Sequence, residues 1–228
     1  MRGKREGRPA EPGGPRRETR VRRPGEASVS KGASRPGERF ASAPASVRII
    51  GGQWKRTPLA VVDAPGLRPS PDRVRETVFN WLAHFMPDLS SVAGLDLFAG
   101  TGVLGFELAS RGAARVTLVE RNSTLEAQLQ RLKSKLGAGT VTIVRGDALA
   151  FAGEARERSF DVVFLDPPFD SDLLEPALRA ASRLVSAEGL VYAESGAPLD
   201  DETAAACGLR IVRAGRAGQV HFHLLQRA

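Results

Sequence analysis

The chain has 228 residues, of which 42% are hydrophobic, so it is long and apolar enough to bury one sizeable core. Its single cysteine, Cys207, excludes an intrachain disulfide and a cysteine-cluster metal site, and its three histidines have no zinc-site spacing. No apolar run approaches the roughly 20 residues that a membrane span needs. We therefore expect a cytoplasmic protein without a metal or a membrane segment.

The net charge of +7 lies entirely in the first 46 residues. Residues 1–46 hold 12 Lys/Arg and 5 Glu, a net charge of 12 − 5 = +7, which leaves the remainder neutral. This segment is rich in Arg, Gly, Pro and Ser and has few large apolar side chains, so we expect it to be a disordered basic tail. It is either an arm that adds non-specific affinity for RNA or a solvated extension.

Residues 47–90 predict a small extension that faces RNA. Val47–Ile50 and Gln53–Lys55 flank Gly51-Gly52, which is the sequence pattern of a two-residue β-hairpin turn, and a further extended stretch follows Pro58. The cations and the aromatic side chain here suit phosphates and an unstacked base, so the candidate RNA contacts are Arg48, Trp54, Lys55 and Arg56. The alternative is a solvated edge hairpin with Trp54 packed inward.

A helix should follow, with Ser70 as N-cap, Pro71 in the first helical position and Asp72 in the first turn. Apolar residues recur at helical spacing, so this face should pack on the main domain: Val74, Val78, Trp81, Leu82 and Phe85. Three arginines lie at or near the helix start, where backbone N–H groups favour anions: Arg68, Arg73 and Arg75. They are candidate phosphate contacts, unless local acidic residues pair with them.

From residue 91 the chain alternates between strand and helix patterns, which predicts a Rossmann-like domain over 91–228. The expected strands are Gly94–Phe98, Arg115–Val119, Thr140–Val144, Phe160–Leu165, Leu190–Glu194, Leu209–Arg213 and Gln219–Leu225. The expected helices are Val103–Arg111, Ser123–Leu136, Ala148–Ala152, Ser171–Val185 and Leu199–Ala206. Such a pattern gives a mostly parallel seven-stranded sheet, and the short last connection makes a late strand antiparallel.

A cofactor loop joins the first of these strands to its helix. Gly100 and Gly102 allow a tight turn and close approach of a ligand, and Glu120 ends the second strand, where it can bond ribose hydroxyls. With Gly105, the glycines also fit the G-x-G-x-x-G pattern of dinucleotide-binding enzymes. An oxidoreductase that binds a nicotinamide or flavin dinucleotide is therefore an alternative.

Two acidic residues favour S-adenosylmethionine over a dinucleotide. Asp96 is costly to bury unless it is paired, and it would attract the α-ammonium group of S-adenosylmethionine but repel a pyrophosphate. Asp147, followed by Ala148 after the third strand, suits an adenine amino group. The predicted cofactor positions all lie at or near strand ends: Asp96, Phe98, Gly100, Gly102, Glu120, Asp147 and Ala148.

The stretch Asp166-Pro167-Pro168-Phe169 follows the buried strand Phe160–Leu165. Its two prolines stiffen the loop and hold an acid and an aromatic ring at the carboxyl end of the strand, where open α/β sheets bind ligands. Asp166 and the Pro167 carbonyl can accept the two hydrogens of an exocyclic amine on a base and aim its lone pair at a methyl donor. Phe169 can stack on the base, which must be single-stranded or flipped out.

Together with flanking motifs, this loop resembles a known family, the bacterial 16S ribosomal RNA guanine-N2 methyltransferases. The motifs are Arg48-Ile49-Ile50-Gly51-Gly52-Gln53-Trp54, Leu67-Arg68-Pro69, Asp72-Arg73-Val74-Arg75-Glu76-Thr77, Phe79-Asn80-Trp81-Leu82, and Gly218-Gln219-Val220 leading to Gln226-Arg227. The resemblance covers residues 47–228. It implies transfer of a methyl group from S-adenosylmethionine to N2 of one guanine in 16S RNA, with a small-subunit particle as partner. We expect a monomeric enzyme.

Besides the dinucleotide oxidoreductase, two further alternatives stay open at this point. The four-residue loop does not separate amines, so methylation of adenine N6 in RNA or DNA is one of them. The other is a ribosome-assembly factor that binds RNA without catalysis, although binding alone does not need Asp166 beside an intact cofactor loop.

Overall fold

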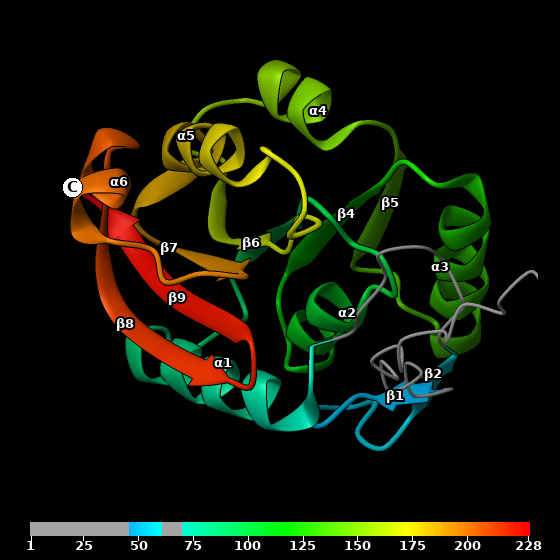
Figure 1. Cartoon of the computed structure of the whole chain (residues 1–228). Helices are drawn as coiled ribbons and strands as arrows, with labels where there is room; N and C mark the ends of the chain where they lie inside the picture. Colours follow the sequence, from blue (N-terminus) through cyan, green and yellow to red (C-terminus); the bar gives the residue numbers. More distant parts are fainter. Residues whose placement is uncertain (1–45, 61–69) are drawn as a thin grey trace, which may run out of the picture. The chain divides into compact units, whose positions relative to one another are not determined.

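The computed structural model describes residues 46–60 and 70–228, which place helices on both faces of a seven-stranded sheet (Figure 1). Its strands are β3 (Ala93–Asp96), β4 (Arg115–Glu120), β5 (Val141–Arg145), β6 (Phe160–Leu165), β7 (Val185–Ser195), β8 (Leu209–Ala217) and β9 (Val220–Arg227). Strand β9 runs antiparallel to β7 and β8, and the other pairs are parallel. The predicted fold class is thereby confirmed.

The strand order creates a switch point in the middle of the sheet. The order is β5-β4-β3-β6-β7-β9-β8, so β3 pairs with β4 on one side and with β6 on the other. Asp96 at the end of β3 is in register with Phe164 near the end of β6. In open α/β sheets, ligands bind in the crevice outside the carboxyl ends of strands at such a point.

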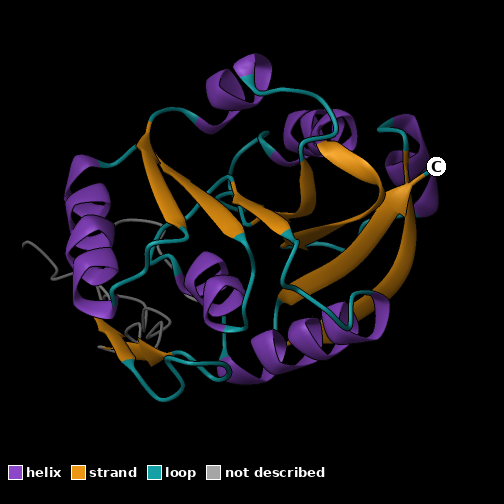
Figure 2. Cartoon of the chain, turned by 180° about the vertical axis from the view of Figure 1, so that it is seen from behind, coloured by secondary structure: helices purple, strands orange, loops and turns teal. Residues whose placement is uncertain are grey.

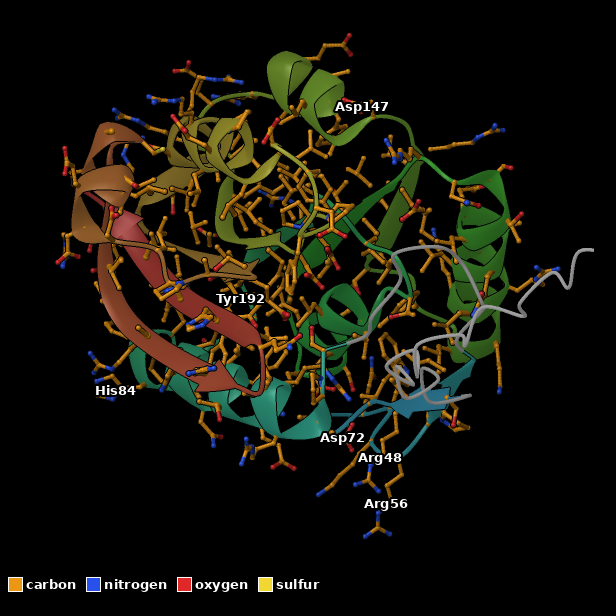
Figure 3. All side chains as sticks on the ribbon, viewed as in Figure 1. Arg48, Arg56, Asp72, His84, Asp147 and Tyr192 are labelled. Carbon is orange, nitrogen blue, oxygen red and sulfur yellow. The ribbon has the colours of Figure 1, made fainter. Side chains whose placement is uncertain are left out.

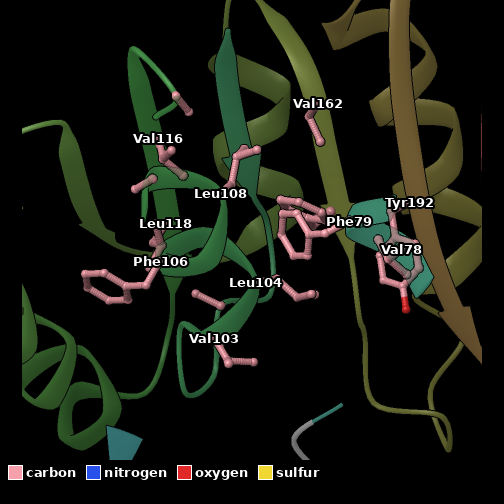
Figure 4. Packing of buried hydrophobic residues seen from close by; sticks show 14 of the residues in the cluster. Val78, Phe79, Val103, Leu104, Phe106, Leu108, Val116, Leu118, Val162 and Tyr192 are labelled. Atoms are coloured by element: carbon pink, nitrogen blue, oxygen red, sulfur yellow. The ribbon is translucent and has the colours of Figure 1, made fainter. Parts of the chain in front are cut away.

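Two helical layers cover the sheet, as the view from behind also shows (Figure 2). On one face pack α1 (Asp72–Phe85), α2 (Val103–Ser110) and α3 (Ser123–Leu136). On the other pack α4 (Ala148–Glu154), α5 (Leu174–Leu184) and α6 (Asp201–Ala206). Phe79 of α1, Leu108 of α2 and Val162 of β6 lie in the first layer, where apolar contact holds α1 to the sheet (Figure 4).

Local capping sets several helix ends. The Asn122 side chain accepts hydrogen bonds from the N–H groups of Thr124 and Leu125, and Gly137 ends α3 in the left-handed conformation, so α3 has the predicted bounds. Helix α5 begins three residues later than predicted, because Ser171 bonds back to the carbonyl of Pro168. Helix α6 begins two residues later than predicted, because Asp200 caps it.

The N-terminal hairpin exists, but the prediction of a two-residue turn at Gly51-Gly52 is wrong. The paired strands are β1 (Ser46–Arg48) and β2 (Pro58–Ala60), so both glycines lie in a longer loop between them. Gly52 has φ of 74°, and a Cβ there would lie 1.8 Å from the Ser110 carbonyl oxygen. The glycines therefore let this loop approach the end of α2 closely, where Ser110 accepts the N–H groups of Gln53 and Trp54.

The capping prediction for Ser70 is also wrong. Pro71 is the N-cap of α1, and no side chain caps it. The hydroxyl of Ser70 instead donates to a carboxylate oxygen of Glu194, at the end of β7. This bond connects the start of α1 to the carboxyl edge of the sheet.

Candidate active site

The glycine loop connects β3 to α2 at the switch point. Gly100 and Gly102 both have positive φ, 51° and 76°, and Gly102 is the N-cap residue of α2. A Cβ on Gly102 would lie 2.5 Å from a side-chain carbon of Leu129. The loop conformation thus depends on glycine at both predicted positions, and it puts the first turn of α2 directly after the carboxyl end of β3.

Asp96 is buried beneath this loop. It is 1% exposed, and its Oδ2 accepts the Gly105 N–H at 3.1 Å. Desolvation raises its pKa to about 7, and the charges of Glu120 and Glu194 add to the rise, while hydrogen bonds from the Gly105 and Phe98 N–H groups oppose it. No cation is paired with Asp96 in the described residues, so a bound ammonium group would stabilise its ionised form.

Glu120 lies at the end of β4 and orders the loops around it. Its Oε2 accepts the Gly100 N–H at 2.8 Å and its Oε1 accepts the Asn122 N–H at 2.7 Å. Each carboxylate oxygen has a second lone pair, so these two bonds leave acceptor capacity for ribose hydroxyls. The residue is 8% exposed, so only a small part of it is open to solvent at this edge of the sheet.

The remaining predicted cofactor positions lie beside the same edge. Asp147 is the N-cap of α4, where its side chain accepts the N–H groups of Leu149 and Ala150 (Figure 3). This capping bond occupies one of its oxygens, Oδ1. Ala148 is buried at the start of α4, and Phe98 packs against the layer that contains α4.

The Asp-Pro-Pro-Phe loop follows β6 on the other side of the switch point. Asp166 is half-buried and Pro167 is buried, while Pro168 and Phe169 are exposed. Phe169 is 38% exposed, and its ring lies 3.6 Å from the point that a Cβ on Gly196 would occupy. The Pro168 carbonyl accepts two hydrogen bonds from Ser171, whereas no donor among the described residues reaches the Pro167 carbonyl. The loop thus offers one carboxylate, one carbonyl and one aromatic ring to a ligand.

Asp166 lies among other carboxyl groups. Desolvation raises its pKa well above the usual range, and the charges of Glu194 and Asp96 raise it further. Register explains the proximity, because Leu165 pairs with Ala193 and the next residues are Asp166 and Glu194. A cation bound between these groups would lower their pKa values and ionise them.

Glu194 is a further acid of this site that was not predicted from the sequence. It is 2% exposed, and it accepts hydrogen bonds from the Ser70 hydroxyl and from the Tyr192 hydroxyl at 2.7 Å. Desolvation raises its pKa, while these two bonds and the charge of Arg75 oppose the rise. One signal was available: Glu194 ends the predicted strand Leu190–Glu194, and Asp96 and Asp166 also lie at or directly after the ends of buried strands.

The predicted RNA-binding residues of the extension divide into exposed and enclosed ones. Arg48, Lys55, Arg56 and Arg73 are exposed, and Arg48 and Arg56 extend from the hairpin side of the molecule (Figure 3). The ring of Trp54 packs edge-on against Phe106 with centroids 6.4 Å apart, which agrees with the inward-packing alternative. Arg68 lies outside the described residues, as do residues 1–45 of the predicted tail.

Arg75 is fully buried, which counts against its predicted contact with RNA. Its guanidinium donates to Asp72 at 2.6 Å and to the carbonyls of Arg48 and Ser70, and it lies 3.5 Å from Glu107. Glu107 in turn accepts the Ile50 N–H and pairs with Arg111. This network attaches β1 and its loop to α1 and α2, so the alternative of local acidic partners describes Arg75.

Comparison with known proteins identifies the family. The family model described as Conserved hypothetical protein 95 matches residues 47–226. The chain is 40% identical over 188 residues to Ribosomal RNA small subunit methyltransferase D of Escherichia coli, a match that covers 82% of this chain and 92% of the relative. The chain belongs to this family.

Other relatives agree with this assignment. The protein of the same name from Haemophilus influenzae is 40% identical over 159 residues, which are 68% of this chain and 81% of the relative. The solved structure of yhhF, a candidate methyltransferase from Escherichia coli, has a TM-score of 0.68 and 39% identity. That match covers 80% of this chain and 98% of the solved one. The resemblance stated from the motifs is confirmed at the level of the family.

Two features are absent from residues 46–60 and 70–228. No helix there is long and apolar enough to cross a membrane. The same residues contain no group of three or more His, Cys, Asp and Glu side chains arranged to hold a metal ion.

Proposed function

We propose that the protein transfers a methyl group from S-adenosylmethionine to the exocyclic N2 amine of one guanine in 16S ribosomal RNA. One observation carries the proposal: the Asp166-Pro167-Pro168-Phe169 loop and the glycine loop Phe98–Gly102 follow the neighbouring strands β6 and β3. The names of the relatives support ribosomal RNA as substrate. Such a substrate places the enzyme in the cytoplasm.

The residues of the crevice fit S-adenosylmethionine by their chemistry. Asp96, Asp166 and Glu194 are buried or half-buried carboxyl groups whose pKa values are raised by desolvation. S-adenosylmethionine supplies an electrophilic methyl group on a sulfonium, together with an ammonium group, so its two cations match these acids. Asp96 would hold the ammonium group, Glu120 the ribose hydroxyls, and the start of α4 at Asp147 and Ala148 the adenine. A dinucleotide pyrophosphate would instead be repelled by the acids.

Asp166 and Pro167 position and activate the amine. The lone pair of an exocyclic amine is delocalised into the base, so the amine is a poor nucleophile. Two acceptors, the Asp166 carboxylate and the Pro167 carbonyl, bind its two hydrogens and favour a pyramidal nitrogen. As the nitrogen–carbon bond forms and the carbon–sulfur bond breaks, the nitrogen becomes cationic, and the carboxylate stabilises that charge. Asp166, with its raised pKa, is suited to receive the proton that the product amine then releases.

Phe169 and the extension bind the nucleotide. The exposed ring of Phe169 offers a stacking surface for an unstacked base, worth roughly 1–3 kcal/mol by the usual effect of removing such a ring. Arg48, Lys55, Arg56 and Arg73 are exposed cations that can contact phosphates. The domain division follows from these roles: 1–46 as a basic tail, 47–90 as the RNA-facing extension and 91–228 as the methyltransferase domain.

Nucleoside mass spectrometry of ribosomal RNA tests the proposal. RNA from a strain that lacks the protein should lose one N2-methylguanosine, and the purified protein with S-adenosylmethionine should restore it. The restoring reaction, run on naked 16S RNA and on small-subunit particles, shows which of the two is the substrate. Loss of N6-methyladenosine instead would overturn the choice of guanine, and no change in any nucleoside would overturn the proposed activity.

A further inference from the structure

The β8–β9 hairpin carries a group of positive charges that no part of the proposed site uses. Residues 203–228 contain four arginines and neither Asp nor Glu. Three of them lie along β8, which is an edge strand of the sheet, and all three are exposed: Arg210, Arg213 and Arg216. The hairpin turn is the Gly218-Gln219-Val220 motif singled out from the sequence.

These arginines have no acidic partner in the described part of the chain. None of the ion pairs there includes an arginine of β8 or β9. Arg213 donates one N–H to the Val212 carbonyl and Arg216 donates one to the Gly218 carbonyl. A guanidinium has five N–H donors, so each retains donors for an external acceptor.

The side chain of Arg213 is held in place by α1. Its guanidinium carbon lies 5.3 Å from the centre of the Phe85 ring. A cation stacked on an aromatic ring loses less freedom when it binds a ligand, and arginine is the side chain that matches phosphate geometry. Arg213 is therefore an ordered donor on the edge of the sheet.

Strand register places the hairpin tip close to the catalytic loop. Arg216 pairs with His221, and His221 pairs with Ser195 at the end of β7. Neighbouring strands are about 4.8 Å apart, so the backbone of Arg216 lies about 10 Å from Ser195. The next residue is Gly196, and a Cβ there would lie 3.6 Å from a ring carbon of Phe169. The hairpin in orange and red thus ends at the same edge of the sheet as β6 and β7 (Figure 1).

We propose that Arg213 and Arg216 form a second RNA-binding surface along the edge strand β8, where their side chains leave opposite faces of the sheet and contact phosphates of substrate RNA that runs past this edge. The inference rests on the proposed function, because it takes RNA as the substrate. RNA flanking the target base would then be contacted by the N-terminal extension and, separately, by the hairpin. Edge strands also carry charges that prevent sheets from pairing with each other. Protection of a sheet edge can be provided by any charged side chain at any place along the edge, so it does not explain arginines close to the catalytic loop.

The test compares two double variants that remove the same charge. The β8 variant, Arg213→Gln/Arg216→Gln, removes the proposed surface. The α3 variant, Arg131→Gln/Lys135→Gln, removes two exposed cations of α3, which lies beside the opposite edge strand. Binding of unmodified 16S RNA transcript is measured by filter binding between 50 and 300 mM KCl. The β8 variant should bind about 10-fold more weakly at low salt, with a log–log salt slope shallower by about 1.4–1.8. The α3 variant should behave as the wild type.

Kinetics and a charge-preserving variant separate the possible outcomes. The β8 variant should raise KM for RNA, with kcat and the Kd for S-adenosylmethionine unchanged, and Arg213→Lys/Arg216→Lys should retain the salt slope. If the wild-type protein methylates RNA but the β8 and α3 variants bind RNA with equal affinity, this inference is overturned and the proposed function is not. Weakened binding to small-subunit particles but not to naked RNA would assign the surface to a ribosomal protein and overturn the RNA contact. If the β8 variant aggregates but binds RNA as the wild type does, the two arginines protect the sheet edge and do not bind RNA.

Discussion

Two groups of buried and half-buried charged residues lie on the α1–α2 side of the sheet, and they are built in opposite ways. In the first, Arg75 and Arg111 pair with Asp72 and Glu107, so each acid there has a cation within 4 Å. In the second, Asp96, Asp166 and Glu194 are acids with raised pKa values, and none has a cation within ion-pair distance among the described residues. Paired charges join parts of a protein, whereas unpaired buried acids destabilise it unless a ligand neutralises them.

The comparison suggests why the second group is tolerated. A group of acids that bind protons in the folded state at neutral pH costs folding free energy, and proteins accept such a cost mainly at functional sites. The cations missing from the acidic group correspond to the ammonium and the sulfonium of S-adenosylmethionine. Substitutions in each group should therefore separate a structural role from a functional one.

The largest effect should follow removal of the carboxylate at Asp166. We expect Asp166→Asn to lower kcat by about 10³-fold, because the charge that develops on the amine loses its counter-ion and its proton acceptor. The Kd for S-adenosylmethionine, measured by calorimetry, should change only a few-fold. Asp170→Asn is the matched control, since Asp170 is exposed on the same loop. Activity of the Asp166 variant within tenfold of the wild type would contradict the mechanism.

The paired group should show its role in stability. Arg75→Met leaves Glu107 short of a partner in a buried site, so we expect the free energy of unfolding to fall by about 3–5 kcal/mol. Arg48→Met removes an exposed partner of the same Asp72, with 63% of the Arg48 side chain accessible, and should cost at most about 1 kcal/mol. Urea denaturation at pH 7 measures both. Equal losses would mean that burial does not distinguish the two arginines.

Asp96→Asn should have opposite effects on binding and on stability. Its loss should weaken S-adenosylmethionine binding by about 10- to 100-fold, which is the scale of one charge-assisted hydrogen bond. The free protein should become more stable by the order of 1–2 kcal/mol near pH 8, because the wild-type carboxyl must ionise in a site that raises its pKa.

The pH dependence gives the sign of the Asp96 effect on stability. The folded-state pKa of about 7 lies above the ordinary aspartate value of 3.8, so the folded state binds more protons between these values. Wild-type stability therefore falls as pH rises through this window, and the gain from Asn should be absent below about pH 4 and complete above about pH 7. Thermal unfolding of both proteins at pH 4 and pH 8 measures it. If Asp96→Asn is less stable than the wild type at pH 8, then Asp96 stabilises the glycine loop and its main role is structural.

Two of the three unpaired acids were predicted from the sequence, whereas Glu194 and the paired group around Arg75 were not. Asp96 and Asp166 end buried strands beside glycine and proline loops, so local pattern and strand polarity were enough to place them together. The Arg75 network and Glu194 depend on residues that are distant in sequence, such as Arg75 with Glu107 and Ser70 with Glu194. The helix pattern of α1 gives its buried face but not its partners. The Gly51-Gly52 turn was misread for the same reason, because the Ser110 carbonyl that excludes a Cβ at Gly52 is 58 residues away in sequence.

The smallest effect concerns how Glu194 tunes Asp166. The charge of Glu194 raises the pKa of Asp166, and Asp166 must be ionised to accept the amine hydrogen, so activity is lost as pH falls through that pKa. Glu194→Gln removes the charge and can still accept the bonds from Ser70 and Tyr192. We expect the acidic limb of the kcat–pH profile to move to lower pH by about half a unit, with the plateau at high pH unchanged.

A matched control separates this electrostatic role from a structural one. Glu188→Gln makes the same change at an exposed position of β7, and it should leave the profile where it is. Asp96, Tyr192 and Arg75 also face this group of acids, but they are unchanged in both variants and so affect both profiles equally. If Glu194→Gln lowers kcat at every pH without moving the limb, Glu194 belongs with the structural group, as an anchor for the start of α1. A limb that moves only in the Glu194 variant places it with Asp96 and Asp166, because only a charge felt by Asp166 changes the pH at which Asp166 ionises.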